Sequence, residues 1–109
     1  MSETRWTKNE LVAYILLYVA NIDLVESSKE KTYILSRVDK EVYESVYKEF
    51  SDDNDYQSIT KITDAVKHQK LFSSFEELFA EIKLMAFADG EFHQMEQTVY
   101  NSIKRLLKS

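Results

Sequence analysis

The sequence contains no cysteine, no proline and a single glycine, and these absences limit both its fold and its chemistry. Without cysteine the chain forms no disulfide, has no thiolate nucleophile and cannot build a zinc–thiolate site. Proline and glycine are the residues that disfavour helix interiors most strongly, so a chain nearly free of both can form helices with few interruptions. The absences therefore favour a helical protein and exclude the classes that depend on cysteine.

Long apolar runs and clusters of basic residues are also missing. The longest apolar stretch, LVAYILLYVA, is shorter than the about 20 residues of a membrane-spanning helix. The N-terminus, MSETRWTKNE, is charged where a signal peptide is apolar, so we expect a cytoplasmic protein without direct insertion into a membrane. With a net charge of −5 and no basic face, nucleic acid is not an expected partner, and cations or basic proteins are favoured instead.

Length and periodicity predict an all-α fold. The chain has 109 residues, which suits a single compact domain over residues 1–109. Apolar residues recur at spacings of three and four, as on the buried face of a helix, and no strand-like alternation is present. We expect a bundle of about six helices, covering about 8–21, 28–38, a segment capped by Asp39 that runs to about Phe50, 56–68, a segment from Ser73 or Ser74 to the Asp-Gly pair, and 94–107.

Several expectations concern individual segments. The first helix should open with a capping box formed by Thr7 and Glu10, and Trp6 should pack against its first turns. Its buried stripe should include Leu11, Ile15, Tyr18 and Val19. The stretch SDDND, residues 51–55, lacks the spacing of a calcium-binding loop and is expected to be a solvated loop.

Aromatic residues are expected to supply bulk to the core. Tyr43, Tyr47 and Phe50 recur on the third predicted helix, where they would face the core or a partner, and the core is the favoured environment.

An internal repeat relates the two ends of the chain. A shift of 66 positions, the separation of Asp23 and Asp89, also places Ala20 on Ala86 and Glu30 on Glu96. Both copies read A-x-x-D, six residues, then E, across the boundary between two predicted helices. We interpret them as two pseudo-repeated helix hairpins, each with an acidic corner.

The two corners differ at two positions. Gly90 stands where the first corner has Leu24, and His93 stands where the first corner has Ser27, which with Glu30 would form a capping box. Glycine tolerates positive φ, whereas histidine is a weaker N-cap than serine.

The corner acids allow two interpretations. Asp23 and Asp89 follow the end of a helix, where the helix dipole disfavours an anion by roughly 0.3–1 kcal/mol. In the first interpretation they turn toward the free N–H groups of the next helix, and Glu30 and Glu96 complete the caps. In the second, carboxylates bind a divalent cation such as Ca²⁺ or Mg²⁺, which prefers oxygen ligands. The candidate ligands are Asp89, Glu91 and Glu96 at the second corner and Asp23 and Glu30 at the first.

Catalytic patterns are weak. Asp64 and His68, four residues apart, could share a proton or a metal ion, but a surface contact is the commoner role of such a pair. The two histidines do not combine with a nucleophile at any recognisable spacing, so we expect a protein that is not an enzyme.

The segments WTKNELVAYILLYVANID and IKLMAFADGEFHQMEQTVYNSI resemble the tellurite-resistance TerB-like family. The hallmark of that family is Ala-Asp-Gly-Glu followed by a glutamate early in the next helix. The resemblance implies a compact all-helical domain, an acidic site for divalent cations at the corner acids given above, and a role in bacterial stress response with membrane-associated partners. The chain departs from the pattern at Leu24 and His93.

Two functional hypotheses follow. The first is a non-enzymatic binding module that responds to Ca²⁺ or another divalent cation through its corner acids. The second is a protein-interaction scaffold in which the same acids only cap helices and a groove between helices receives a basic or helical partner.

Overall fold

The computed structural model describes residues 6–22, 28–69, 74–86 and 93–108. Within these ranges the side chains of residues 30–31, 68–69, 75, 85–86, 93–96 and 108 are not described.

The described residues form an all-α bundle, as the sequence predicts, and contain no strand. The elements in chain order are α1 (Lys8–Ile22), α2 (Ser28–Ser36), α3 (Lys40–Asp52), α4 (Asp55–Asp64), the π-helical turn η1 (Ala65–Gln69), α5 (Phe75–Ala86) and α6 (His93–Lys108). None of these helices is both long and apolar enough to cross a membrane.

Capping side chains set the starts of α1 and α3 as predicted. The Thr7 N–H donates to Glu10 Oε1 at 2.9 Å, and the Glu10 N–H donates to Thr7 Oγ1 at 3.1 Å, which completes the predicted capping box. Asp39 caps α3 by accepting from the N–H groups of Glu41 and Val42. These caps satisfy backbone donors that the first turn of a helix leaves free.

The starts of α4 and α5 add detail that the sequence left open. Asn54 and Gln57 form a second capping box, which is not among the predicted ones. For α5, the Glu77 N–H donates to Ser74 Oγ, so the second of the two proposed starts is the observed one.

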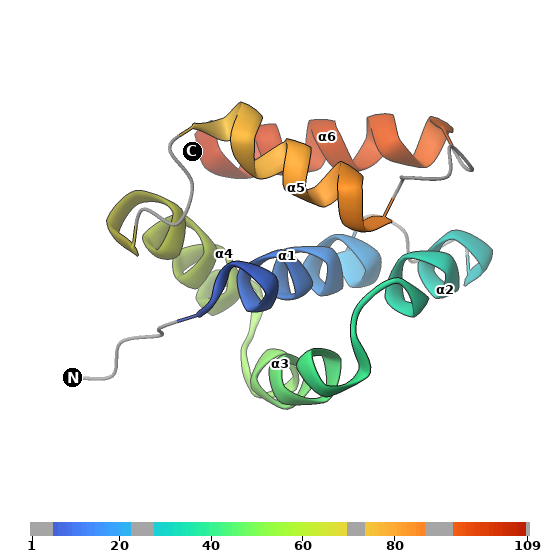
Figure 1. Ribbon diagram of the computed structural model, residues 1–109. Coiled ribbons are helices and arrows are strands. Elements are labelled where there is room, and N and C mark those ends of the chain that lie inside the picture. Colours follow the sequence, from blue (N-terminus) through green and yellow to red (C-terminus); the bar gives the residue numbers. More distant parts are fainter. Residues whose placement is uncertain (1–5, 23–27, 70–73, 87–92, 109) are drawn as a thin grey trace.

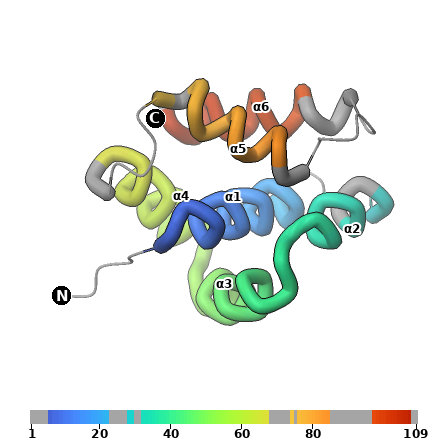
Figure 2. Tube along the Cα trace, viewed as in Figure 1, coloured from blue at the N-terminus to red at the C-terminus, as the bar shows by residue number. Residues whose placement is uncertain are grey.

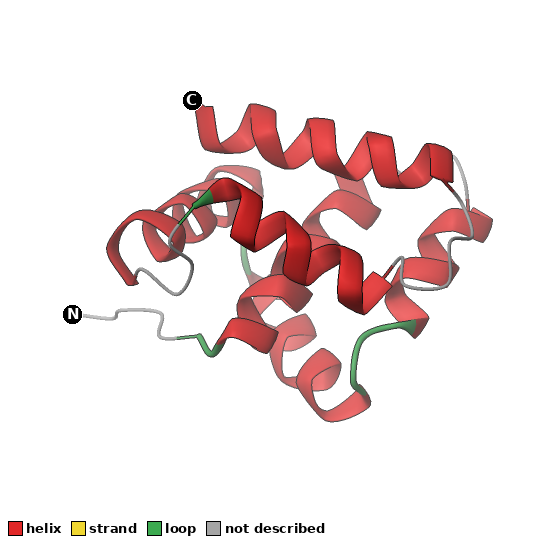
Figure 3. Ribbon diagram, turned by 45° about the horizontal axis from the view of Figure 1, so that its top comes forward, coloured by secondary structure: helices red, strands yellow, loops and turns green. Residues whose placement is uncertain are grey.

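The α1 helix lies at the centre of the molecule. It contacts α2, α3, α4, α5 and α6, and it packs most extensively against α3. In Figure 1, α5 and α6 cover one side of α1 and α3 lies on the other, while α4 and α2 lie toward opposite ends. The Cα trace in Figure 2 and the turned view in Figure 3 show the same arrangement.

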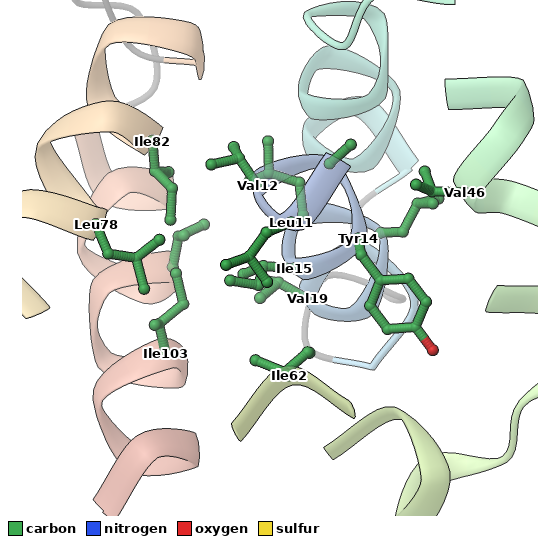
Figure 4. Close-up of a cluster of buried hydrophobic side chains, with 14 of the residues drawn as sticks. Leu11, Val12, Tyr14, Ile15, Val19, Val46, Ile62, Leu78, Ile82 and Ile103 are labelled. Carbon is green, nitrogen blue, oxygen red and sulfur yellow. The ribbon is translucent and has the colours of Figure 1, made fainter. Parts of the chain in front are cut away.

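The core surrounds α1 on all sides. Every residue from Leu11 to Leu17 has no exposed surface, and Val19 and Ala20 are also buried. Figure 4 shows one face of α1 turned toward apolar side chains of α5 and α6, and Tyr14 on another face with its hydroxyl pointing away from them. The predicted stripe is therefore too narrow, because a helix that is apolar around its whole circumference is buried rather than amphipathic.

The aromatic residues of α3 divide between core and surface. Phe50 packs partly buried against the core, and its ring meets Tyr14 edge to face at 5.5 Å. Tyr43 is half-buried and stacks on Tyr47, which is 47% exposed. The core assignment is therefore wrong for Tyr47.

Candidate functional site

Two helix corners carry the residues that the sequence analysis proposed as metal ligands. At the first corner α1 ends at Ile22 and α2 begins at Ser28, and at the second α5 ends at Ala86 and α6 begins at His93. The helix boundaries thus agree with the two predicted hairpins. Asp23, Asp89 and Glu91 fall in the connections and lie outside the described residues.

The remaining two proposed ligands lie within helices. Glu30 is the third residue of α2 and Glu96 is the fourth residue of α6, but their side chains are outside the description. The helix dipole favours acidic side chains at these early positions of a helix. Both the capping interpretation and the metal-ligand interpretation place a glutamate there, so the helix bounds do not distinguish them. The ligand set therefore stays a prediction.

The helix ends that flank the two corners lie toward the same end of the molecule. In Figure 1, α1 and α5 run toward the right-hand end, and α2 and α6 begin there and run back. Figure 3, turned about the horizontal axis, shows α2 and the start of α6 at that same end. The fold therefore places the ends of α1 and α5 and the starts of α2 and α6 toward one end of the bundle.

Elsewhere the described side chains do not gather into a metal site. Among them, no three residues of the histidine, cysteine, aspartate and glutamate types come together. Asp64 is exposed near the end of α4, and the His68 side chain lies outside the description, so their proposed pairing stays a prediction.

A network of polar side chains joins the start of α1 to α3 and α4, and we call it the Lys61 network. Its members are Trp6, Tyr14, Glu49, Asp53, Ser58 and Lys61. The Lys61 Nζ lies 2.6 Å from Glu49 Oε2 and 2.9 Å from Asp53 Oδ2. This ammonium therefore lies between two carboxylates.

Tyr14 connects this ion pair to the core. Its hydroxyl lies 2.6 Å from Asp53 Oδ2, to which it donates, and 3.1 Å from Ser58 Oγ. Ser58 is 1% exposed, and in the described residues no buried side-chain nitrogen or oxygen lacks a hydrogen-bond partner. The network thus satisfies its polar groups at a place where unsatisfied ones would be destabilising.

Trp6 completes the network on the α1 side. Its ring lies on Tyr14 with centroids 4.5 Å apart, and its Nε1–H donates to Glu49 Oε1 at 3.1 Å. The expected packing of Trp6 against α1 is confirmed, and the hydrogen bond to α3 was not anticipated.

The environment raises two pKa values in the network. Burial raises the pKa of Tyr14 well above its ordinary value of 10.0, and the hydrogen bond to Asp53 raises it further. Burial lowers the pKa of Lys61, but the hydrogen bonds to Glu49 and Asp53 outweigh this, so the net shift from 10.5 is upward. Near neutral pH Tyr14 stays neutral and Lys61 stays charged, so neither acts as a base there. The arrangement is suited to holding segments together.

The expected solvated loop at residues 51–55 needs correction. Ser51 and Asp52 belong to α3 and Asp55 begins α4, so the connection is reduced to Asp53 and Asn54. The Asp53 side chain is 9% exposed and forms an ion pair with Lys61. In the sequence, Asp53 is only one of several adjacent acids. The spacing of Glu49, Asp53 and Lys61 in the sequence only weakly indicates these ion pairs, because contact with Lys61 depends on how α4 folds back on α3.

Comparison of the chain with protein-family models, with curated proteins and with solved structures found no match.

Proposed function

We propose that the protein is a non-enzymatic binding module that responds to divalent cations. The ligands are Asp89, Glu91 and Glu96 at the second corner, with Asp23 and Glu30 contributing from the first. Carboxylates are the hard oxygen ligands that Ca²⁺ and similar ions prefer. In this proposal the protein works in the cytoplasm with protein partners, and ion binding stiffens the α5–α6 hairpin.

The main support is that the helix ends flanking the two corners lie toward one end of the bundle (Figure 1). Separated acids form a credible site only if the fold brings their connections together, because two carboxylates on one turn bind a divalent ion weakly. The helix boundaries add that Asp89 and Glu91 fall, in the sequence, between the end of α5 and the start of α6. The resemblance of these segments to the TerB-like family favours the same role and suggests bacterial stress response as its setting.

Calorimetric titration with Ca²⁺, Mg²⁺ and Mn²⁺ tests the proposal. We expect site-specific binding that Asp89→Asn weakens by at least about tenfold, which corresponds to about 1.4 kcal/mol. Asp23→Asn should weaken it too if both corners contribute. Asp52→Asn is the matched control, because Asp52 is exposed on α3 and its change removes the same charge. No binding at millimolar ion would exclude the proposal.

A second candidate function, a protein-interaction scaffold, is favoured by exposed aromatic residues. Tyr47 on α3 is 47% exposed and stacks on Tyr43, and Tyr56 at the start of α4 is 77% exposed. Tyrosine is enriched at protein interfaces, where its ring is buried while its hydroxyl still finds a polar partner. Here the corner acids would serve only as helix caps.

Titration of the labelled protein with a basic helical peptide distinguishes the second candidate from the first. The scaffold predicts amide shifts on α3 that Tyr47→Ala removes and that do not depend on Ca²⁺. A spectrum unchanged by the peptide would count against it.

A further inference from the structure

Trp6 is buried although it lies outside any helix. It comes two residues before α1 begins, yet it is 5% exposed. Its ring contacts Tyr14 on α1, and its indole N–H donates to Glu49 on α3. These two contacts connect the N-terminal end of the described chain to both helices of the most extensive helix pair.

The two contacts belong to a closed ring of side chains. Trp6 bonds to Glu49, Glu49 to Lys61, Lys61 to Asp53, Asp53 to Tyr14, and the ring of Tyr14 returns to Trp6. Each member therefore has two neighbours within the ring. A change at any one member alters the surroundings of the next.

Lys61 positions both partners of Trp6. On one side, Glu49 accepts from Lys61 through Oε2 and from Trp6 through Oε1, so its pairing with Lys61 orients the oxygen that Trp6 uses. On the other side, Asp53 accepts from both Lys61 and the Tyr14 hydroxyl through the same Oδ2. That bond holds the tyrosine whose ring carries Trp6.

Lys61 neutralises two carboxylates that α3 already places near each other, because Glu49 and Asp53 are four residues apart at the end of this helix. Glu49 Oε2 and Asp53 Oδ2 lie 2.6 Å and 2.9 Å from the same Nζ, so both negative groups face one small volume. Without the ammonium, the two carboxylates repel each other at this spacing. The carboxylate of Asp53, whose side chain is only 9% exposed, is also poorly solvated.

We propose that Trp6 is a latch whose closure depends on the positive charge of Lys61. Neutralising Lys61 separates Glu49 from Asp53, and the latch opens because the indole loses both its oriented acceptor and its fixed ring partner. Opening exposes the Tyr14 ring and the Glu49 carboxylate at the edge between α1 and α3. Trp6 and the α3–α4 junction are thereby coupled, although they are far apart in sequence.

Fluorescence of Trp6, the single tryptophan of the chain, measures the latch directly. We expect a blue-shifted emission and weak acrylamide quenching in the unmodified protein. Lys61→Met should shift the emission to the red and raise the quenching constant severalfold while far-UV circular dichroism still reports folded helices. Lys61→Arg, which keeps the charge, should leave Trp6 shielded.

Three further variants separate the latch from general destabilisation. Lys67→Met removes an exposed lysine from η1 and should not change the quenching. Ile103→Val weakens the apolar core on α6 and should also leave Trp6 shielded. Adding Asp53→Asn to Lys61→Met relieves the repulsion and should restore part of the shielding. A folded Lys61→Met protein with unchanged quenching, or equal exposure in Lys67→Met or Lys61→Arg, would overturn the proposal.

A reciprocal measurement applies even where Lys61→Met fails to fold, because coupling acts in both directions. Trp6→Phe keeps an aromatic ring but removes the indole donor. We expect faster acetylation of Lys61 by acetic anhydride in this variant, followed by mass spectrometry, with no change at Lys67. Equal reactivity of Lys61 with and without Trp6 would contradict the coupling.

Discussion

Lys61 on α4 forms ion pairs with both Glu49 and Asp53, and so connects α4 to α3 and to the residue that follows it. Its side chain is 29% exposed, whereas that of its partner Asp53 is 9% exposed, so the ion pair lies at the boundary between surface and interior. Pairs fully in water contribute roughly 0–1 kcal/mol, while the loss of one partner of a buried pair is far more destabilising. Because this pair lies between these two extremes, its net contribution to the free energy of unfolding depends on the hydrogen bonds around it.

Tyr14 gives a prediction at the residue scale. Tyr14→Phe keeps the ring that packs on Trp6 and Phe50 but removes the hydroxyl bonded to Asp53 and Ser58. We expect a loss of about 1–3 kcal/mol in the free energy of unfolding at neutral pH, because buried polar partners are left with fewer bonds. Urea denaturation measures the loss, and Tyr56→Phe, at a residue 77% exposed, should show none.

The same residue predicts how stability depends on pH. Because the folded-state pKa of Tyr14 lies above its ordinary value of 10.0, the folded protein holds this proton at pH values where the unfolded chain loses it. The contribution of Tyr14 is thus complete below about pH 10 and falls as the pH rises above it. Lys61 acts in the same direction above its ordinary value of 10.5. We expect denaturation midpoints to fall steeply above pH 10, and less steeply in Tyr14→Phe; parallel curves would contradict this assignment.

The helix starts show how far local sequence determines the elements. The boxes at Thr7 and Asn54 close through side chains three residues apart, so they form wherever the helix forms. The start of α1 was predicted because its capping pair has the common Thr-x-x-Glu form. The sequence predicts the start of α4 one residue late, because the Asn54–Gln57 box departs from the common Ser/Thr-x-x-Glu form and the adjacent acids favour a loop.

Asn54→Ala tests the importance of the α4 cap. We expect the free energy of unfolding to fall by about 0.5–2 kcal/mol, because the Gln57 N–H loses the Asn54 side-chain oxygen that accepts its hydrogen bond. Thermal denaturation of the variant beside Thr60→Ala, at an exposed position within α4, provides the comparison. A smaller loss in Asn54→Ala than in Thr60→Ala would show that the cap does not set this helix start.

The hairpins illustrate the limit of reasoning from single elements. The sequence predicted where α1, α2, α5 and α6 begin and end to within about two residues. It could not show that the flanking ends of α1, α2, α5 and α6 lie toward one end of the bundle, because this depends on the paths of α3 and α4 between the two helix pairs (Figure 2). The five proposed ligands remain predictions that ion titration can test.

At the scale of the whole molecule, the fold is organised around one apolar helix. The Cα radius of gyration is 12.8 Å, close to the about 13 Å expected for a compact chain of this length. Since α1 contacts all the other α-helices, its side chains link the α5–α6 layer to the α3 side of the bundle. A defect in α1 therefore weakens several helix contacts together.

Leu16→Ala tests this central role. Leu16 has no exposed surface, so we expect the substitution to leave a cavity and to lower the free energy of unfolding by about 2–5 kcal/mol. Leu84→Ala makes the same chemical change at a residue 69% exposed on α5, and it should alter stability by less than about 0.5 kcal/mol. Chemical denaturation of both variants should show the difference, and equal losses would mean that α1 is not the common core.

The helical class and most helix boundaries follow from local sequence, because caps and apolar spacing act over three or four residues, and the repeat of the acidic corners is visible there as well. Tertiary packing sets which residues are buried on every side, which aromatic side chain of α3 is exposed, and the contact of Glu49 and Asp53 with Lys61. These outcomes depend on distances across the fold, since the partner of a charged side chain is set by how two helices pack. For that reason an acid that looks like part of a solvated loop becomes, in the folded protein, a nearly buried partner of Lys61 and Tyr14.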